Sequence, residues 1–140
     1  MYLVGHAGGQ TANRHHFFGL DHHLLHLNPL GHIIYADEVA TGIGWPLNSG
    51  FQMELAFAAI GIGLIGFLGF WNKTFWLPFI ITKTTFMWGA GFTHILHMIQ
   101  NDNFSPSNTG IVVYWDFLLP IILIVLYIRY WREQKSESSN

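Results

Sequence analysis

The hydrophobic positions of this chain gather into three long runs, each long enough to form a membrane-spanning helix. The runs extend from Phe51 to Trp71, from about Thr74 to Ile99 and from about Ile111 to Trp131. A transmembrane helix needs about 20 predominantly apolar residues. A buried helix of a soluble protein is an alternative for one such run, but it does not account for three runs in succession. The pattern therefore predicts an integral membrane bundle of three transmembrane helices.

The first part of the chain has a different pattern, in which histidines and leucines recur with the period of a helix. A helix with Asn13 as N-cap and Asn28-Pro29 as its end places five histidines within an arc of roughly 120°, with most leucines on the opposite side. These histidines are His15, His16, His22, His23 and His26. Such an amphipathic helix is too polar to cross a bilayer and suits the membrane interface. The predicted fold class is therefore all-α, with a histidine-rich amphipathic interfacial helix before the three transmembrane helices.

The composition supports a membrane protein. Hydrophobic residues make up 51% of the 140 residues and charged residues only 10%, whereas a soluble domain carries about a quarter charged residues. The formal net charge of -2 is small and the charges are scattered, so no nucleic-acid partner is expected. Cysteine is absent, which excludes disulfides, thiolate metal sites and a cysteine nucleophile.

The few basic residues predict the orientation in the membrane. Arg129, Arg132 and Lys135 lie at the end of the third run, and Lys73 lies between the first two. The N-terminal part before the first run contains only Arg14. Basic residues favour the cytoplasmic side, so the N-terminus is expected outside and the C-terminus in the cytoplasm. The expected organisation is an extracytoplasmic histidine-rich segment over residues 1–50, a transmembrane domain over residues 51–131 and a cytoplasmic polar tail over residues 132–140.

Ionisable residues inside the predicted spans are the strongest indication of function, because such residues are costly in lipid. Lys83 in the second run stands apart, nearer the middle of the membrane, and the others lie near the outer ends: Glu54 in the first run, His94 and His97 in the second and Asp116 in the third. At a rise of 1.5 Å per residue those near the outer ends fall within roughly the same 8 Å layer, which Gln52 and His32 can also reach. We therefore expect one shared polar cluster, in which Glu54 faces His94 or Asp116 and not lipid.

Three interpretations of the histidines and carboxylates stay open. They can bind a transition metal ion or haem, because neutral imidazole is a ligand for both and carboxylates can support it. They can instead hold helices together by hydrogen bonds, or they can handle protons, since imidazole titrates near neutrality. The candidate metal ligands are His22, His23, His26, His32, His94, His97, Glu54 and Asp116.

The loop "NDNFSPSNTG" joins the second and third runs directly above this predicted layer. It is rich in Asn and Ser, whose side chains satisfy backbone groups in tight turns. We expect an ordered lid, in which Asn103 and Asn108 hydrogen-bond into the layer and Phe104 points inward as an apolar anchor. Such a lid would shield the cluster from bulk water and strengthen its internal electrostatics.

Several short stretches of the chain are similar to a known family. They are "GHIIYADEVATGIGW", "SGFQMELAFA", "FMWGAGFTHILHMI", "NFSPSNTG" and "YWDFLLP". From about His32 to the C-terminus the chain resembles an uncharacterised family of small bacterial multi-pass membrane proteins, a domain of unknown function. The resemblance implies a location in the bacterial inner (cytoplasmic) membrane and implies no activity. Residues that match the polar positions of the family are His32, Gln52, Glu54, His94, Asn103, Asn108 and Asp116.

The sequence leaves three classes of function open. The leading hypothesis is a non-enzymatic accessory or structural subunit of a larger membrane complex, because the chain is small, has short loops and lacks a recognisable catalytic motif. The first alternative is a histidine-based metal- or haem-binding membrane protein with a redox role, and the second is proton or ion handling. The expected partners are the lipid bilayer and other membrane protein subunits.

Overall fold

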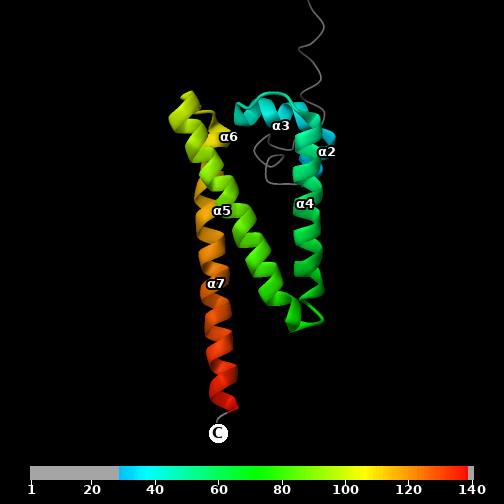
Figure 1. Ribbon diagram of the computed structural model, residues 1–140, viewed down its shortest axis with the longest axis vertical. Coiled ribbons are helices and arrows are strands. Elements are labelled where there is room, and N and C mark those ends of the chain that lie inside the picture. Colours follow the sequence, from blue (N-terminus) through cyan, green and yellow to red (C-terminus); the bar gives the residue numbers. More distant parts are fainter. Residues whose placement is uncertain (1–28, 139–140) are drawn as a thin grey trace, which may run out of the picture.

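The computed structural model describes residues 29–138, and the regular elements in this range are all helical. Three long helices form the body of the molecule (Figure 1): α4 (Ser49–Leu68), α5 (Trp76–Asn101) and α7 (Ile111–Glu137). A short 3₁₀ helix, η1 (Lys73–Phe75), joins α4 to α5. The all-α fold class is thereby confirmed for the described residues. The predicted interfacial helix from Asn13 to Asn28 lies outside them.

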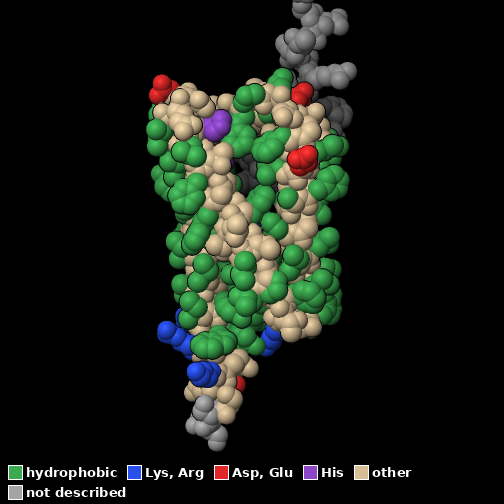
Figure 2. All heavy atoms as spheres, in the orientation of Figure 1, with side chains coloured by type: hydrophobic (Ala, Val, Ile, Leu, Met, Phe, Trp, Pro, Cys, Tyr) green, Lys and Arg blue, Asp and Glu red, His purple; other side chains and the backbone are tan. Residues whose placement is uncertain are grey.

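The path of α5 determines the shape of the bundle. It runs diagonally from the end of α4 to the start of α7 and packs along α7, so α4 and α5 diverge toward the end at which α7 begins (Figure 1). Short helices lie across this end, which we call the capped end: α2 (Pro29–Ile34), α3 (Ala36–Ile43) and α6 (Pro106–Thr109). The opposite end, which we call the basic end, carries Lys73, Arg129, Arg132 and Lys135 (Figure 2).

Local sequence signals fix where these helices begin and end. The Asn48 side chain accepts a hydrogen bond of 3.0 Å from the N–H of Phe51 and so caps the start of α4. Gly44 ends α3 in the left-handed conformation, with φ of 76°, which favours glycine because a Cβ is strained there. A side chain at Gly44 would also collide with Asn103 and Ser105. Glycine therefore allows the loop after α5 to approach the end of α3.

Two of the three predicted spans are long and apolar enough to cross a membrane, judged over the part of the chain that the structure describes. They are Ser49–Leu68 and the stretch Pro106–Glu137. The middle helix, α5, has 26 residues, but it contains four threonines, two histidines and Lys83, which lower its hydropathy. Length and composition therefore support two spans, and α5 does not meet the same hydropathy criterion.

The long helices expose most of their apolar surface. Only 11% of the most apolar window of each candidate span is buried, and Phe57, Leu64, Phe92 and Leu126 are more than half exposed. A soluble monomer rarely exposes such extensive apolar surface. Most of the buried side chains belong to the capped half, and they include His32, Val39, Gln52, His94, Asn108 and Asp116.

Candidate functional site

Two histidines of the capped half are each held by a side-chain amide from another helix. Nδ1 of His32 on α2 lies 2.6 Å from Oε1 of Gln52 on α4. Nδ1 of His94 on α5 lies 2.8 Å from Oδ1 of Asn108 on α6. All four side chains are buried, where an unpaired polar group is costly. The two pairs therefore fasten α2 to α4 and α5 to α6.

Asn108 also determines which nitrogen of His94 carries a proton. Its Nδ2 donates to the backbone carbonyl of Asn103 at 2.9 Å and to that of His94 at 3.3 Å. The amide oxygen is therefore the atom that faces the imidazole, and Nδ1 of His94 must donate to it. In a neutral imidazole the other nitrogen, Nε2, is then an acceptor. His94 thus presents an acceptor toward α7.

Asp116 on α7 faces this acceptor. Its Oδ2 lies 4.0 Å from Nε2 of His94, and among the described residues Oδ2 has no hydrogen-bond partner although the atom is buried. A carboxylate and a neutral imidazole nitrogen would place two acceptors opposite each other, which is unfavourable in a buried site. We infer that the pair holds one proton, either on the carboxyl group or on the imidazole.

A cavity of about 520 Å³ lies beside this pair, between α4, α5 and α7 and next to the end of α3. The space-filling view is hollowed in the same half of the molecule (Figure 2). Much of the wall is apolar, with Leu55, Phe86 and Met87 among its residues. The polar and ionisable members of the wall include His32, Trp45, Lys83, His94, Ser107 and Asp116.

Lys83 brings a cation to this cavity. It is partly buried on α5 and lines the same cavity as Asp116. Lys83 precedes His94 by eleven residues, which is about three turns of helix, so both lie on one face of α5. The cavity therefore combines a cation, a carboxyl group and two imidazoles within an otherwise apolar wall.

The indole of Trp45 lines the cavity and packs against two histidines of α5. Its ring centroid lies 5.6 Å from that of His94 and 5.0 Å from that of His97. Its Nε1 is buried and has no hydrogen-bond partner within residues 29–138. The cavity wall thus contains both an unsatisfied donor, on Trp45, and an unsatisfied acceptor, on Asp116.

The loop after α5 closes the capped end as a lid. Asn103 donates from Nδ2 to the backbone carbonyl of Ile43 at 2.9 Å, and its Oδ1 accepts from the N–H of Ser105 at 3.1 Å. The predicted hydrogen bond of Asn108 into the polar layer is confirmed, whereas Asn103 bonds to the end of α3 instead. The predicted inward position of Phe104 is wrong, because its side chain is 67% exposed. The turn that Asn103 makes with Ser105 directs the intervening side chain outward.

The structure brings together only some of the predicted site residues. Glu54 is exposed on α4, so the expectation that it faces His94 or Asp116 is wrong. Gln52, two residues earlier and about 200° around the helix, occupies the buried position. His97 is partly exposed and bonds through Nδ1 to the side chain of Asn101 at 3.2 Å.

The metal-site prediction is not tested. His22, His23 and His26 lie outside the described residues. Within residues 29–138, no three His, Asp or Glu side chains form a group that could hold a metal ion. A site of three or more such ligands that includes His32, His94, His97, Glu54 or Asp116 would therefore need a ligand from outside residues 29–138, and it stays a prediction.

Sequence reasoning placed Lys83 apart from the polar cluster and did not single out Trp45, although both line the cavity. Lys83 had a usable signal, because its spacing from His94 places both on one helical face. Trp45 had none, because the segment between α3 and α4 has no periodicity from which a side-chain direction follows.

The fold and the cavity define a class: an all-helical protein with two helices long and apolar enough to cross a membrane and a polar cavity near one end. The model of a family of unknown function (DUF6790) matches residues 24–136. The chain belongs to this family, which confirms the resemblance to a domain of unknown function. No curated protein and no solved structure matches the chain.

Proposed function

We propose that this protein crosses the membrane three times. α4 ends at the basic end and α7 begins at the capped end (Figure 1), so if both cross the bilayer, α5 must cross it between them. With 26 residues α5 is long enough. Its polar residues Lys83 and His94 line the cavity, while Ile81 and Phe92 are more than half exposed. α5 can therefore present an apolar side to lipid despite its lower hydropathy.

We place the basic end in the cytoplasm and the capped end outside the bacterial inner membrane. Lysines and arginines favour the cytoplasmic side, and those of α7 and η1 lie at the basic end (Figure 2). Because the chain has no cysteine, single cysteines report the topology directly. A membrane-impermeant maleimide applied to intact cells should label Asp102→Cys and leave Ser136→Cys unlabelled until the cells are opened. The reverse pattern would contradict this orientation.

For the function, we propose that the cavity binds a small amphipathic molecule. The observation that carries this proposal is the unsatisfied, buried Oδ2 of Asp116 in an apolar wall that also contains Lys83. Small-molecule sites are mostly apolar cavities of about 300–1,000 Å³ with a few convergent polar groups. This cavity has that size and that composition.

The polar groups define what the ligand needs. A hydroxyl or amine group can donate to Oδ2 of Asp116, and an oxygen acceptor can receive a hydrogen bond from the indole N–H of Trp45. The proton held between His94 and Asp116 can pass to or from such a group without leaving the site. The role is therefore ligand binding with proton exchange, which joins the proton-handling hypothesis to a specific pair of residues.

The test is analysis of small molecules that co-purify with the full chain in mild detergent. Organic extracts of the wild type, of Lys83→Met and of Glu54→Gln are compared by mass spectrometry. A molecule retained by the wild type and by Glu54→Gln, whose site is exposed, should be lost from Lys83→Met. Identical extracts from all three would overturn the proposal. Elemental analysis and an absorption spectrum of the same samples test the metal or haem alternative, which a stoichiometric metal or a haem band would support.

A role as an accessory subunit of a larger membrane complex is the second candidate. It is favoured by the separation of α4 from α7 (Figure 1) and by the exposed apolar faces of both helices. A partner helix could cover these faces in place of lipid. Size measurement after mild solubilisation at native expression level tests it. A species of defined larger mass supports the subunit role, and a monodisperse monomer contradicts it.

A further inference from the structure

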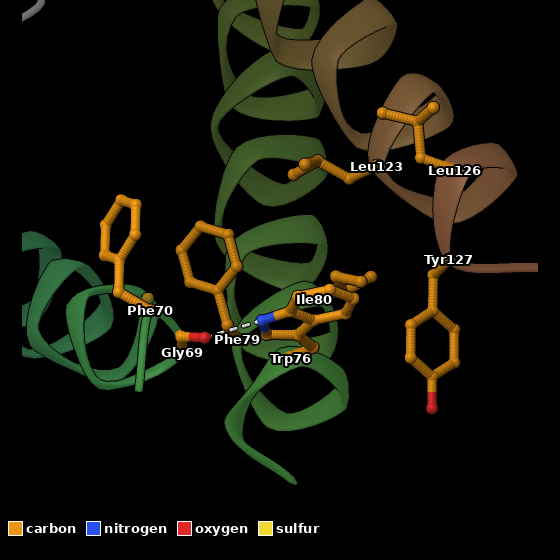
Figure 3. Close-up of a pocket in the computed structure, with 9 residues that line it drawn as sticks. Gly69, Phe70, Trp76, Phe79, Ile80, Leu123, Leu126 and Tyr127 are labelled. Carbon is orange, nitrogen blue, oxygen red and sulfur yellow. Dashed lines mark hydrogen bonds between the residues drawn. The ribbon is translucent and has the colours of Figure 1, made fainter. Parts of the chain in front are cut away.

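A second hollow, which we call the basic-end groove, lies between the end of α4, the start of α5 and α7 (Figure 3). Its volume is about 440 Å³, and its wall is apolar and aromatic. Phe79 and Ile80 come from α5, and Leu123, Leu126 and Tyr127 come from α7. Figure 3 shows the leucines toward one end of the groove and the Tyr127 hydroxyl pointing toward the other, where α5 begins.

Glycines on and after α4 bring the chain close to α5 and so shape this groove. A Cβ at Gly66 would lie 2.7 Å from the ring of Phe79, and one at Gly69 would lie 2.9 Å from the ring of Trp76. Nε1 of Trp76 donates to the carbonyl of Gly69 at 2.8 Å (Figure 3). Because the indole N–H is satisfied inside the protein, the tryptophan ring is fixed as part of the wall.

A cation stands at the polar end of the groove. Nζ of Lys73 lies 5.5 Å from the centroid of the Trp76 ring and 5.0 Å from that of the Tyr130 ring. These two rings meet edge to face, with centroids 4.9 Å apart, and together hold the ammonium group. The end of α7 also carries three basic residues, Arg129, Arg132 and Lys135, and two acidic ones, Glu133 and Glu137. This end of the molecule therefore carries net positive charge.

We propose that the basic-end groove binds an anionic phospholipid, with one acyl chain along the groove and the phosphate at Lys73. The groove changes along its length from leucine side chains to a phenol and an ammonium group, as a phospholipid changes from chain to head group. Basic pockets between transmembrane helices on the cytoplasmic side suit anionic lipid head groups. An apolar helix of a second copy would fill the groove but leave Lys73 without an anion.

The proposal rests on membrane insertion and not on the ligand of the central cavity. If lipid preference is absent while a small molecule still co-purifies through Lys83, only the present inference fails. If the reverse holds, only the ligand proposal fails.

The test is native mass spectrometry of the full chain in mild detergent, titrated with phosphatidylglycerol or with phosphatidylcholine of the same acyl chains. The wild type should retain phosphatidylglycerol about fivefold more strongly, since one surface cation contributes about 1 kcal/mol toward an anionic lipid. Lys73→Gln should remove this preference, whereas Lys135→Gln, a matched loss of charge on α7, should keep it. Leu126→Trp should fill the groove and reduce retention of both lipids, whereas Val125→Trp, at a neighbouring exposed position outside the groove, should not.

Several outcomes would overturn the proposal. Equal retention of the two lipids by the wild type would remove the role of the cation. An equal effect of Lys73→Gln and Lys135→Gln would indicate general attraction to the basic end and not a site. A wild-type dimer that Leu126→Trp converts to a monomer would show that a second copy occupies the groove. Melting temperatures of the four variants within a few degrees of the wild type confirm that they are folded.

Discussion

In the capped half of the bundle, polar side chains connect the helices in pairs, whereas in the basic half the helices meet through glycines and aromatic rings. His32 with Gln52 and His94 with Asn108 are the connecting pairs of the capped half. In the basic half, Gly66 lies against Phe79 and the Trp76 indole donates to a backbone carbonyl. Close packing at a glycine also occurs in the capped half, where Gly91 lies against Phe117, so the buried hydrogen-bonded pairs are what distinguish that half.

The two halves also differ in whether their buried polar atoms have partners, and this difference indicates where a ligand can bind. In the basic half, the tryptophan N–H that faces the groove is satisfied by Gly69. In the capped half, Trp45 Nε1 and Asp116 Oδ2 are buried without a partner among the described residues, and both residues line the cavity. A buried polar atom without a partner costs free energy of folding. The capped half thus gives up stability at the place where a ligand would supply the missing partners.

The largest loss of stability is expected for Asn108→Ala, which tests the polar pairing of the capped half. Asn108 is fully buried, and its removal strands Nδ1 of His94 and two backbone carbonyls. The free energy of unfolding in detergent should fall by about 3 kcal/mol. Asn101→Ala is the matched control, because it removes only an exposed hydrogen bond to His97. Equal melting temperatures for the two variants would mean that packing and not hydrogen bonding holds the lid.

A loss of about 2 kcal/mol is expected for Gly66→Ala, which tests the close packing of the basic half. The added methyl group would lie 2.7 Å from the ring of Phe79, so α4 and α5 must separate. Gly63→Ala is the control on the same helix, because nothing lies within 4 Å of its Cβ position. The control should be neutral or slightly stabilising, since alanine is the better helix former. Chemical denaturation of both variants shows whether the contact of Gly66 with Phe79 sets the distance between α4 and α5.

A smaller loss, about 1 kcal/mol, is expected for Gln52→Ala, because it leaves the buried His32 without its amide partner. Glu54→Ala should change stability by less than about 0.5 kcal/mol, since the side chain is exposed. Thermal unfolding of these two variants compares a buried with an exposed position of the same helix, α4. If Glu54→Ala proved the more damaging, the assignment of the buried face of α4 would be reversed.

The contrast between Gln52 and Glu54 also shows how far the sequence could predict the site. Hydropathy and the rise per residue located the long helices and the common depth of His94, Asp116 and the start of α4. They did not give the rotation of α4 about its axis, because its apolar residues lie on all sides and leave no polar stripe to orient it. The sequence therefore predicted the Glu54 carboxylate in the cluster, whereas the structure has the Gln52 amide at the buried position.

The lid shows the same limit for a loop. Asparagine and serine correctly predicted hydrogen-bonded turns in the residues after α5. The direction of Phe104 depends on the turn in which the Asn103 side chain accepts a hydrogen bond from the N–H of Ser105. That turn accompanies the contact of Asn103 with Gly44, which is 59 residues away in the sequence. Long-range contacts of this kind have no local signal, so the outward position of Phe104 could not be predicted.

A small gain in stability is expected for Asp116→Asn in the cavity. The introduced amide can donate to Nε2 of His94 with its own N–H, so the pair no longer has to hold an additional proton. We expect the free energy of unfolding to rise by about 0.5–1 kcal/mol, while the co-purifying molecule is lost because the carboxyl acceptor is gone. Asp102→Asn is the control, since Asp102 is exposed and left-handed at the end of α5, a conformation that asparagine also tolerates. Unfolding in detergent together with mass analysis of extracts separates the two effects.

A gain in stability with loss of the ligand would mean that the unsatisfied carboxyl group is retained for binding. A loss of stability comparable to that of Asn108→Ala would mean that Asp116 is a structural partner like the other polar residues of the capped half, and the distinction between paired and unsatisfied groups would no longer hold.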